Sequence, residues 1–105
     1  MTRARRPMRR VGDLLPEAAR ALGLEEELRL ARASSTFAAI LAERAPAVAG
    51  SARLVRVAGD AVIVEVDHPL VAQEVRLRSV ELLEALAAAP GGLRAAEIRT
   101  VVARG

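Results

Sequence analysis

The sequence predicts an α+β fold of two layers, in which a three-stranded sheet is covered on one face by helices. Two observations predict it. Apolar residues recur at helical spacing up to Ala45 and again after Asp67, and they alternate with a period of two in the stretches between and beyond. The predicted element order is α-α-β-β-α-β. The chain has 105 residues, of which 52% are hydrophobic and 28% charged, so it is expected to form one domain with a buried core.

Residues 1–10 differ in charge from the rest of the chain. They carry five of the 16 arginines and no acid, so the other 11 arginines face all 13 acids and residues 11–105 have a charge of about −2. Without an apolar period, residues 1–10 are predicted to be a flexible arm and residues 11–105 a globular domain. Because arginine binds phosphate, the arm predicts weak, sequence-independent, salt-sensitive DNA binding; a solubilising terminus without a ligand is the alternative. The predicted nucleic-acid-binding residues are Arg3, Arg5, Arg6, Arg9 and Arg10.

Two helices are expected before the sheet. The first is capped by Asp13 and buries an apolar face that runs from Val11 to Leu22, and Gly23 is expected to end it. The second begins near Leu24, where three consecutive glutamates fit the positive end of the helix dipole. It must end before Pro46.

Two strands and a hairpin are predicted from Ala52 onward, because β-branched residues become dense there. Gly59 suits the tight turn between the strands. Along the second strand, one set of alternating residues is expected to face the core and the other to be partly wet. The core set is Val62, Val64 and Val66, and the other set is Ala61, Ile63 and Glu65.

A third, longer helix and a last strand complete the predicted domain. Asp67 is expected to cap the helix, and Pro90 with two following glycines to end it. A short strand from Ile98 to Val102 is expected to return beside the hairpin. This order is also that of a type II KH domain with an extra leading helix, although the GxxG loop by which RNA-binding KH domains hold the backbone is absent.

Composition excludes most chemistry. The chain has no cysteine, no lysine and a single histidine, His68, so thiolate, two-histidine and P-loop sites are ruled out, and no serine has a nucleophile-elbow context. One aromatic residue, Phe37, cannot form a base-stacking platform. A carboxylate-only magnesium site at Glu65 and Asp67 is the one metal alternative. We therefore predict no catalytic residue, no metal, no cofactor and no small-molecule substrate. No apolar run approaches the roughly 20 residues needed to cross a bilayer, so a cytoplasmic protein without membrane contact is expected.

Three segments carry a family resemblance. They are VGDLLPEAARALGL at Val11–Leu24, GDAVIVEVDHPLVAQEVRLRSVELLEAL at Gly59–Leu86, and the AEIR that begins at Ala96. In their order and spacing they resemble the DciA family, which recruits or loads the bacterial replicative DnaB-type helicase. The chain departs from the family at Phe37 and Val71, where tryptophan is common. Both positions lie on the predicted inward faces, which favours a packing role for them.

The resemblance implies a non-enzymatic adaptor in bacterial DNA replication initiation, with a DnaB-type helicase and DNA as partners and a nucleoid-associated location in the cytoplasm. We expect the helicase to contact the outer face of the third helix and the exposed strand face, and DNA to contact the arm. The predicted partner-binding residues are Arg53, Arg56, Gln73, Glu74 and Arg76, with Arg99 on the same strand face. Three alternatives stay open: a KH-like RNA- or ribosome-associated factor, a small enzyme using His68, and an interaction domain that pairs through a sheet edge.

Overall fold

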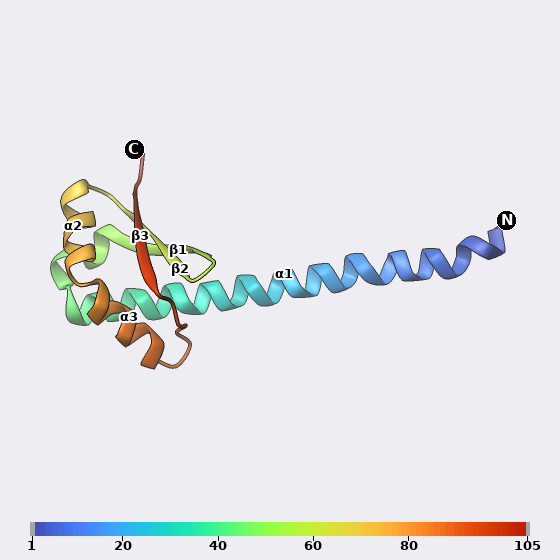
Figure 1. Cartoon of the computed structure of the whole chain (residues 1–105), viewed down its shortest axis with the longest axis horizontal. Helices are drawn as coiled ribbons and strands as arrows, with labels where there is room; N and C mark the ends of the chain where they lie inside the picture. The colour runs from blue at the N-terminus through green and yellow to red at the C-terminus, as the bar shows by residue number, and fades with distance from the viewer. Residues whose placement is uncertain (1, 105) are drawn as a thin grey trace.

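A computed structural model describes the backbone of residues 2–104 and the side chains of residues 17–104. It confirms the α+β class: a three-stranded sheet packs on helices, and one long helix extends away from this body (Figure 1). The elements in chain order are α1 (Thr2–Arg44), the 3-10 helix η1 (Pro46–Ser51), β1 (Ala52–Ala58), β2 (Ala61–Val66), α2 (Pro69–Leu77), α3 (Ser79–Ala88) and β3 (Glu97–Val102).

The prediction of two leading helices is wrong, because α1 is a single helix of 43 residues that passes through Gly23. A glycine inside a helix costs only about 1 kcal/mol relative to alanine, and it ends a helix only when it adopts a positive φ. Positive φ angles occur at Gly59 and Gly91, not at Gly23. The side chains of the predicted basic arm, residues 1–10, lie outside the described residues, so the flexible arm stays a prediction.

Only the C-terminal part of α1 packs against the body. Ala33, Phe37 and Leu41 are fully buried, and Leu30 is the first apolar residue that contacts the core. From residue 17 to residue 29 every side chain is exposed. α1 therefore anchors the domain with its C-terminal part, while the side chains of residues 17–29 face solvent (Figure 1).

The sheet has the order β1-β2-β3, with β2 in the centre. β1 and β2 are antiparallel and joined by the predicted hairpin, in which Gly59 has a φ of 62°. β3 runs parallel to β2, so the last strand returns beside the hairpin as predicted. The three core-facing valines of β2 are fully buried. On the opposite face of β2, Ile63 is buried, although this face was expected to be partly exposed to water. Arg56 and Arg99 flank Ile63 in register, and the apolar stems of arginine side chains can shield an apolar neighbour from solvent.

The predicted third helix is divided into α2 and α3 at Arg78, whose backbone leaves the helical region (φ −104°, ψ 13°). The predicted cap was also wrong. His68 caps α2, its Nδ1 accepting a hydrogen bond of 3.0 Å from the Leu70 amide, while the Asp67 carboxylate is occupied by Arg53. The observed order from α1 to β3 is α-β-β-α-α-β, which roughly matches the predicted order.

Candidate functional site

The predicted partner-binding residues fall on two different surfaces. Arg53 and Arg56 lie on the face of β1 that points away from the core, in register with Glu65 and Ile63 of β2. The other three predicted residues, Gln73, Glu74 and Arg76, lie on α2. The buried residues of α2 pack with the core-facing valines on the opposite side of the sheet. The structure therefore does not bring the five residues into one site.

On the open face of the sheet, Arg53 is already paired. Its guanidinium lies 3.0 Å from Glu65 Oε1 and 2.7 Å from Asp67 Oδ1. The hydrogen bond to Asp67 and then the one to Glu65 raise the pKa of Arg53 above its ordinary value. The two carboxylates proposed as a magnesium alternative are thus the acceptors of an arginine, and the cation that a partner would meet is largely neutralised.

Arg56 is the freer cation of this face. It has no carboxylate within salt-bridge distance among the residues that the structure describes, whereas Arg99 on the far strand lies 3.1 Å from Glu97. Arg56, Ile63 and Arg99 form one row across the three strands. The open face is therefore a mixed-charge surface on which Arg56, on the edge strand β1, has no carboxylate partner among the described residues.

The charged residues of α2 and α3 form a second network, centred on Arg78. Arg78 Nε lies 2.6 Å from Glu74 Oε2 and Arg78 Nη1 lies 3.6 Å from Glu81, which Arg44 of α1 also approaches at 3.4 Å. The hydrogen bond to Glu74 raises the pKa of Arg78. The network spans the break between the two helices. Outside it, Arg76 donates a hydrogen bond of 3.1 Å to Thr100 Oγ1 and Gln73 is exposed.

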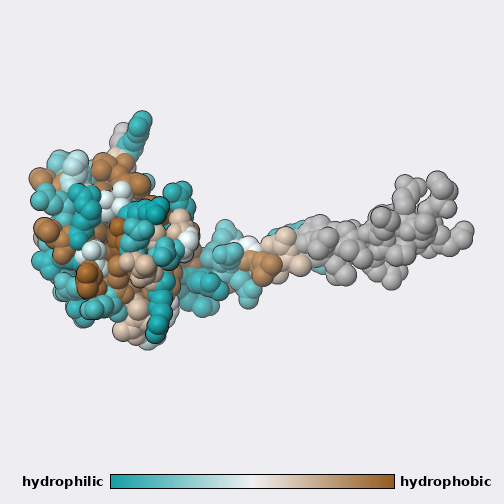
Figure 2. Space-filling view, in the orientation of Figure 1, coloured by the Kyte–Doolittle hydropathy of each residue, from teal (hydrophilic) through white to brown (hydrophobic). Residues whose placement is uncertain are grey.

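The same helices carry several large, exposed apolar side chains that the sequence analysis did not select as functional residues. Leu70 is 69% exposed, Leu77 74% and Val80 69%. Leu70, Gln73 and Leu77 follow helical spacing along α2, and Val80 lies in the first turn of α3, just after the break at Arg78. We call these four residues the α2 stripe. Figure 2 shows hydrophobic patches, separated by hydrophilic residues, over this end of the molecule. The signal in the sequence is that these apolar residues fall outside the predicted inward face of the helix.

The described residues contain no cluster of side chains that could hold a metal ion, since no group of three or more histidine, aspartate or glutamate side chains among them is placed for it. The Nδ1 atom of His68, the only imidazole, is used as a helix cap. Within the same residues no helix is both long and apolar enough to cross a membrane.

Comparison with known proteins identifies the family. A family model described as "Dna[CI] antecedent, DciA" matches residues 10–100 of the 105-residue chain. No curated protein and no solved structure matches significantly. The family match begins within α1 and ends within β3, so it covers most of α1, the β1–β2 hairpin, both short helices and the first part of β3, which are the elements that build the two surfaces described above. The chain belongs to the DciA family, and this membership gives it a role in DNA replication initiation.

Proposed function

We propose that the chain is a non-enzymatic adaptor that binds a DnaB-type helicase through the α2 stripe and DNA through the basic segment 1–10. Membership of the DciA family supports the helicase as partner. The observation that carries the choice of surface is the exposure of Leu70, Leu77 and Val80 on the two consecutive helices α2 and α3. Soluble monomers expose scattered single apolar residues, but a row of them on adjacent helix turns marks a protein-binding surface.

Charged side chains border the α2 stripe, so a partner would have to match both its apolar residues and these charges. Glu74 and Glu81 share Arg78, so the rim of the stripe is held in one geometry and is close to neutral. Apolar side chains surrounded by ordered polar groups are the composition of an interface centre, where a few residues supply most of the binding energy. We therefore expect the helicase contact to depend on the stripe more than on the paired Arg53.

Leu77→Glu is expected to weaken helicase binding at least tenfold, because it removes an apolar anchor and buries a carboxylate in the interface, with a cost of about 2 kcal/mol or more. Binding is measured by biolayer interferometry with the immobilised helicase of the same organism. Leu22→Glu is the matched control, since Leu22 is a similarly exposed leucine on α1, away from the stripe. Loss of binding with Arg56→Glu and not with Leu77→Glu would move the contact to the open face of the sheet.

For DNA, replacing the five arginines of residues 1–10 by serine is expected to flatten the salt dependence of binding. If all five contact phosphates of duplex DNA, they contribute a slope of about −4.5 in a plot of log K against log salt concentration. Fluorescence anisotropy with a labelled fork duplex measures this slope. The control replaces three exposed arginines of the described body, Arg20, Arg29 and Arg94, by serine. An equal change in the control would show that DNA follows the body and not the basic segment.

The KH-like order of elements favours one second candidate, an RNA-binding function. The same anisotropy experiment with structured RNA as competitor separates the two. A helicase adaptor is expected to prefer the fork, whereas an RNA-binding protein is expected to release the fork DNA at a low concentration of RNA. Because the sequence contains no GxxG loop and one aromatic residue, RNA recognition would have to rely on backbone charge alone.

A further inference from the structure

The side of α1 that faces away from the body carries an apolar row of its own. Apolar or small residues recur along it at alternating spacings of three and four residues, and every one of them is exposed. They are Ala21, Leu24, Leu28, Ala31, Ser35, Ala38 and Ala42, and we call them the outer face of α1. At 1.5 Å per residue the outer face is about 33 Å long. Glu17, the next position toward the N-terminus, is charged and ends the apolar pattern.

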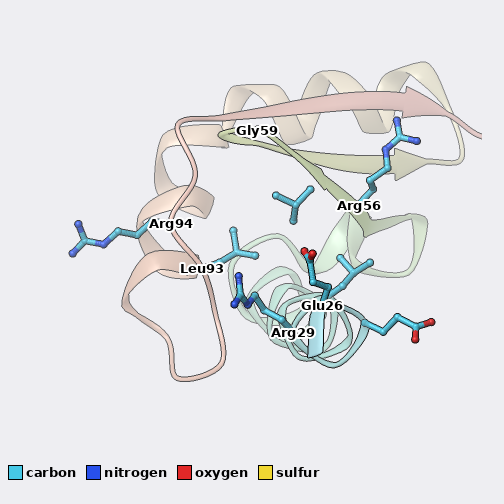
Figure 3. Close-up of a pocket in the computed structure, with 9 residues that line it drawn as sticks. Glu26, Arg29, Arg56, Gly59, Leu93 and Arg94 are labelled. Carbon is cyan, nitrogen blue, oxygen red and sulfur yellow. The ribbon is translucent and has the colours of Figure 1, made fainter. Parts of the chain in front are cut away.

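The body does not cover the outer face. The side chains that α1 buries in the core, with Phe37 as the largest, lie on the other side of the helix. Figure 3 shows α1 nearly end-on, with Glu26 and Arg29 pointing toward the groove that they line between α1 and the rest of the body. Leu24 and Leu28 are each 56% exposed. α1 therefore has two apolar faces, of which the described chain covers one.

We propose that the outer faces of two copies of this chain pack against each other as a parallel, in-register, two-stranded coiled coil over residues 21–42. Alternating spacings of three and four residues are the pattern by which two helices bury a shared seam. A two-fold dimer uses the same patch on both copies, as the outer face requires. The proposal concerns self-association and does not depend on the proposed helicase or DNA contacts.

The charges beside the outer face favour a second copy as the occupant. Arg20 and Glu27 each directly precede a position of the face, and Glu25 and Arg32 each directly follow one. In a parallel pair, a residue of the first kind lies beside the residue that follows the next position of the face on the other helix. Arg20 of one copy therefore meets Glu25 of the other, and Glu27 meets Arg32. Each of the four charges faces an opposite charge, so the seam is complementary to itself.

These four side chains are available for such contacts. Among the described residues none of them takes part in a salt bridge. Opposite charges pair along a helix at a spacing of three or four residues, and α1 offers no such partner to Glu27 or to Arg32. A second copy supplies the charge that the helix lacks at these two positions.

The fold also lowers the cost of association. The C-terminal part of α1 is held against the core, so the helix presents this part of its outer face without first having to order. The side chains of residues 17–29 have no cover, and a helical segment without tertiary packing is only marginally stable in water. A second helix along the outer face stabilises this segment.

The first test is the mass of the full chain by size-exclusion chromatography with light scattering, over about a hundredfold range of concentration. Salt is kept at about 0.15 M or above, because a parallel pair brings the two basic segments 1–10 to one end, where like charges repel unless they are screened. We expect the mass to rise from 11.1 kDa toward twice that value. A mass of one chain at every concentration overturns the proposal.

Two leucine variants locate the contact on α1. Leu28→Glu is expected to raise the dimer dissociation constant at least tenfold, because it places a carboxylate in the apolar seam. Leu22→Glu adds the same charge at a leucine that is 60% exposed and lies outside the outer face, so it is expected to leave the dissociation constant unchanged. An equal effect of the two variants overturns the proposal.

Charge exchange tests the pairing and its direction. Glu27→Arg and Arg32→Glu each set like charges against one another in a homodimer, so each variant alone is expected to dimerise several-fold more weakly than the parent chain. In a one-to-one mixture the two variants restore both ion pairs in the heterodimer, which is expected to form as readily as the parent dimer. A mixture that associates no better than either variant alone would show that the helices do not pair in this way.

Disulfide trapping tests the register, because the chain has no cysteine of its own. A disulfide forms only when the two Cα atoms come within about 7 Å. In the parallel pair Leu24 of one copy faces Leu24 of the other, so oxidised Leu24→Cys is expected to run as a covalent dimer. Leu22→Cys, outside the outer face, is expected to stay a single chain. An antiparallel pair would leave Leu24→Cys uncross-linked, and that result contradicts the proposal.

Discussion

Phe37→Ala is expected to lower the free energy of unfolding by about 3–5 kcal/mol, which is the usual cost of removing a fully buried aromatic ring. Phe37 is the largest fully buried side chain and the only aromatic residue of the chain. It lies on α1, in the same cluster as Leu54, Val64 and Leu86, so its ring joins the helix to both the sheet and α3. No neighbouring aromatic residue can move in to fill the cavity.

Urea denaturation followed by circular dichroism measures the loss. A domain of this size has a total stability of about 5–15 kcal/mol, so the substitution can remove most of it. A stabilising osmolyte is therefore added to every sample, and the variants are compared by the shift of their urea midpoints. Phe37→Leu keeps most of the volume and is expected to lose less than Phe37→Ala. Leu22→Ala, at an exposed site, is expected to change stability by less than about 0.5 kcal/mol. A loss in Phe37→Ala no larger than in Leu22→Ala would contradict the central place of Phe37 in the core.

The burial of Phe37 also bears on the two positions where the family often has tryptophan. Phe37 is fully buried and Val71 is partly buried against the same core. Neither presents a full side chain to a partner. The structure therefore supports the packing interpretation of both positions, and it leaves partner recognition to exposed side chains such as Leu77.

The sequence predicted those elements well whose formation depends on residues that are close together in the chain. The hairpin followed from β-branched alternation and from the positive φ that Gly59 supplies, and the core face of β2 followed from its period of two. The helix boundaries were predicted less well. Gly23 was expected to end a helix, although flanking residues with high helix propensity carry α1 through it. The break at Arg78 has no proline or glycine to mark it, so the helical spacing of the apolar residues predicted one continuous helix there.

The candidate site was predicted only in part, because exposure and pairing depend on contacts between distant segments. Arg53 was expected to face a partner, but Glu65 and Asp67 are brought beside it by strand pairing. Leu70 and Leu77 lie outside the predicted inward face of the helix, but they were not selected, because single apolar residues are common on the surfaces of soluble proteins. Likewise the exposure of Leu22 follows from where α1 leaves the body, a property of the whole fold.

Gly92→Ala is expected to lower the free energy of unfolding by about 3 kcal/mol, because an added methyl group has no space. A Cβ atom at Gly92 would lie 1.9 Å from the carbonyl oxygen of Leu86 and 3.1 Å from that of Ala89. Both are backbone atoms at the end of α3, and the Gly92 amide itself donates to Ala89 at 3.0 Å, so the turn cannot open without loss of that bond. Leu86 is fully buried, and its displacement would disturb the core.

Alanine substitutions at two other glycines, Gly59 and Gly23, serve as controls for the stability loss expected of Gly92→Ala. Gly59→Ala meets open space but keeps a φ of +62°, so it is expected to cost about 1–2 kcal/mol from backbone strain alone. Gly23→Ala also meets open space, inside a helix, and is expected to stabilise the chain by up to about 1 kcal/mol. Thermal unfolding should therefore rank the variants with Gly23→Ala above the parent chain, Gly59→Ala below it and Gly92→Ala lowest. If Gly92→Ala unfolds no earlier than Gly59→Ala, the turn after α3 is looser than its contacts with Leu86 require.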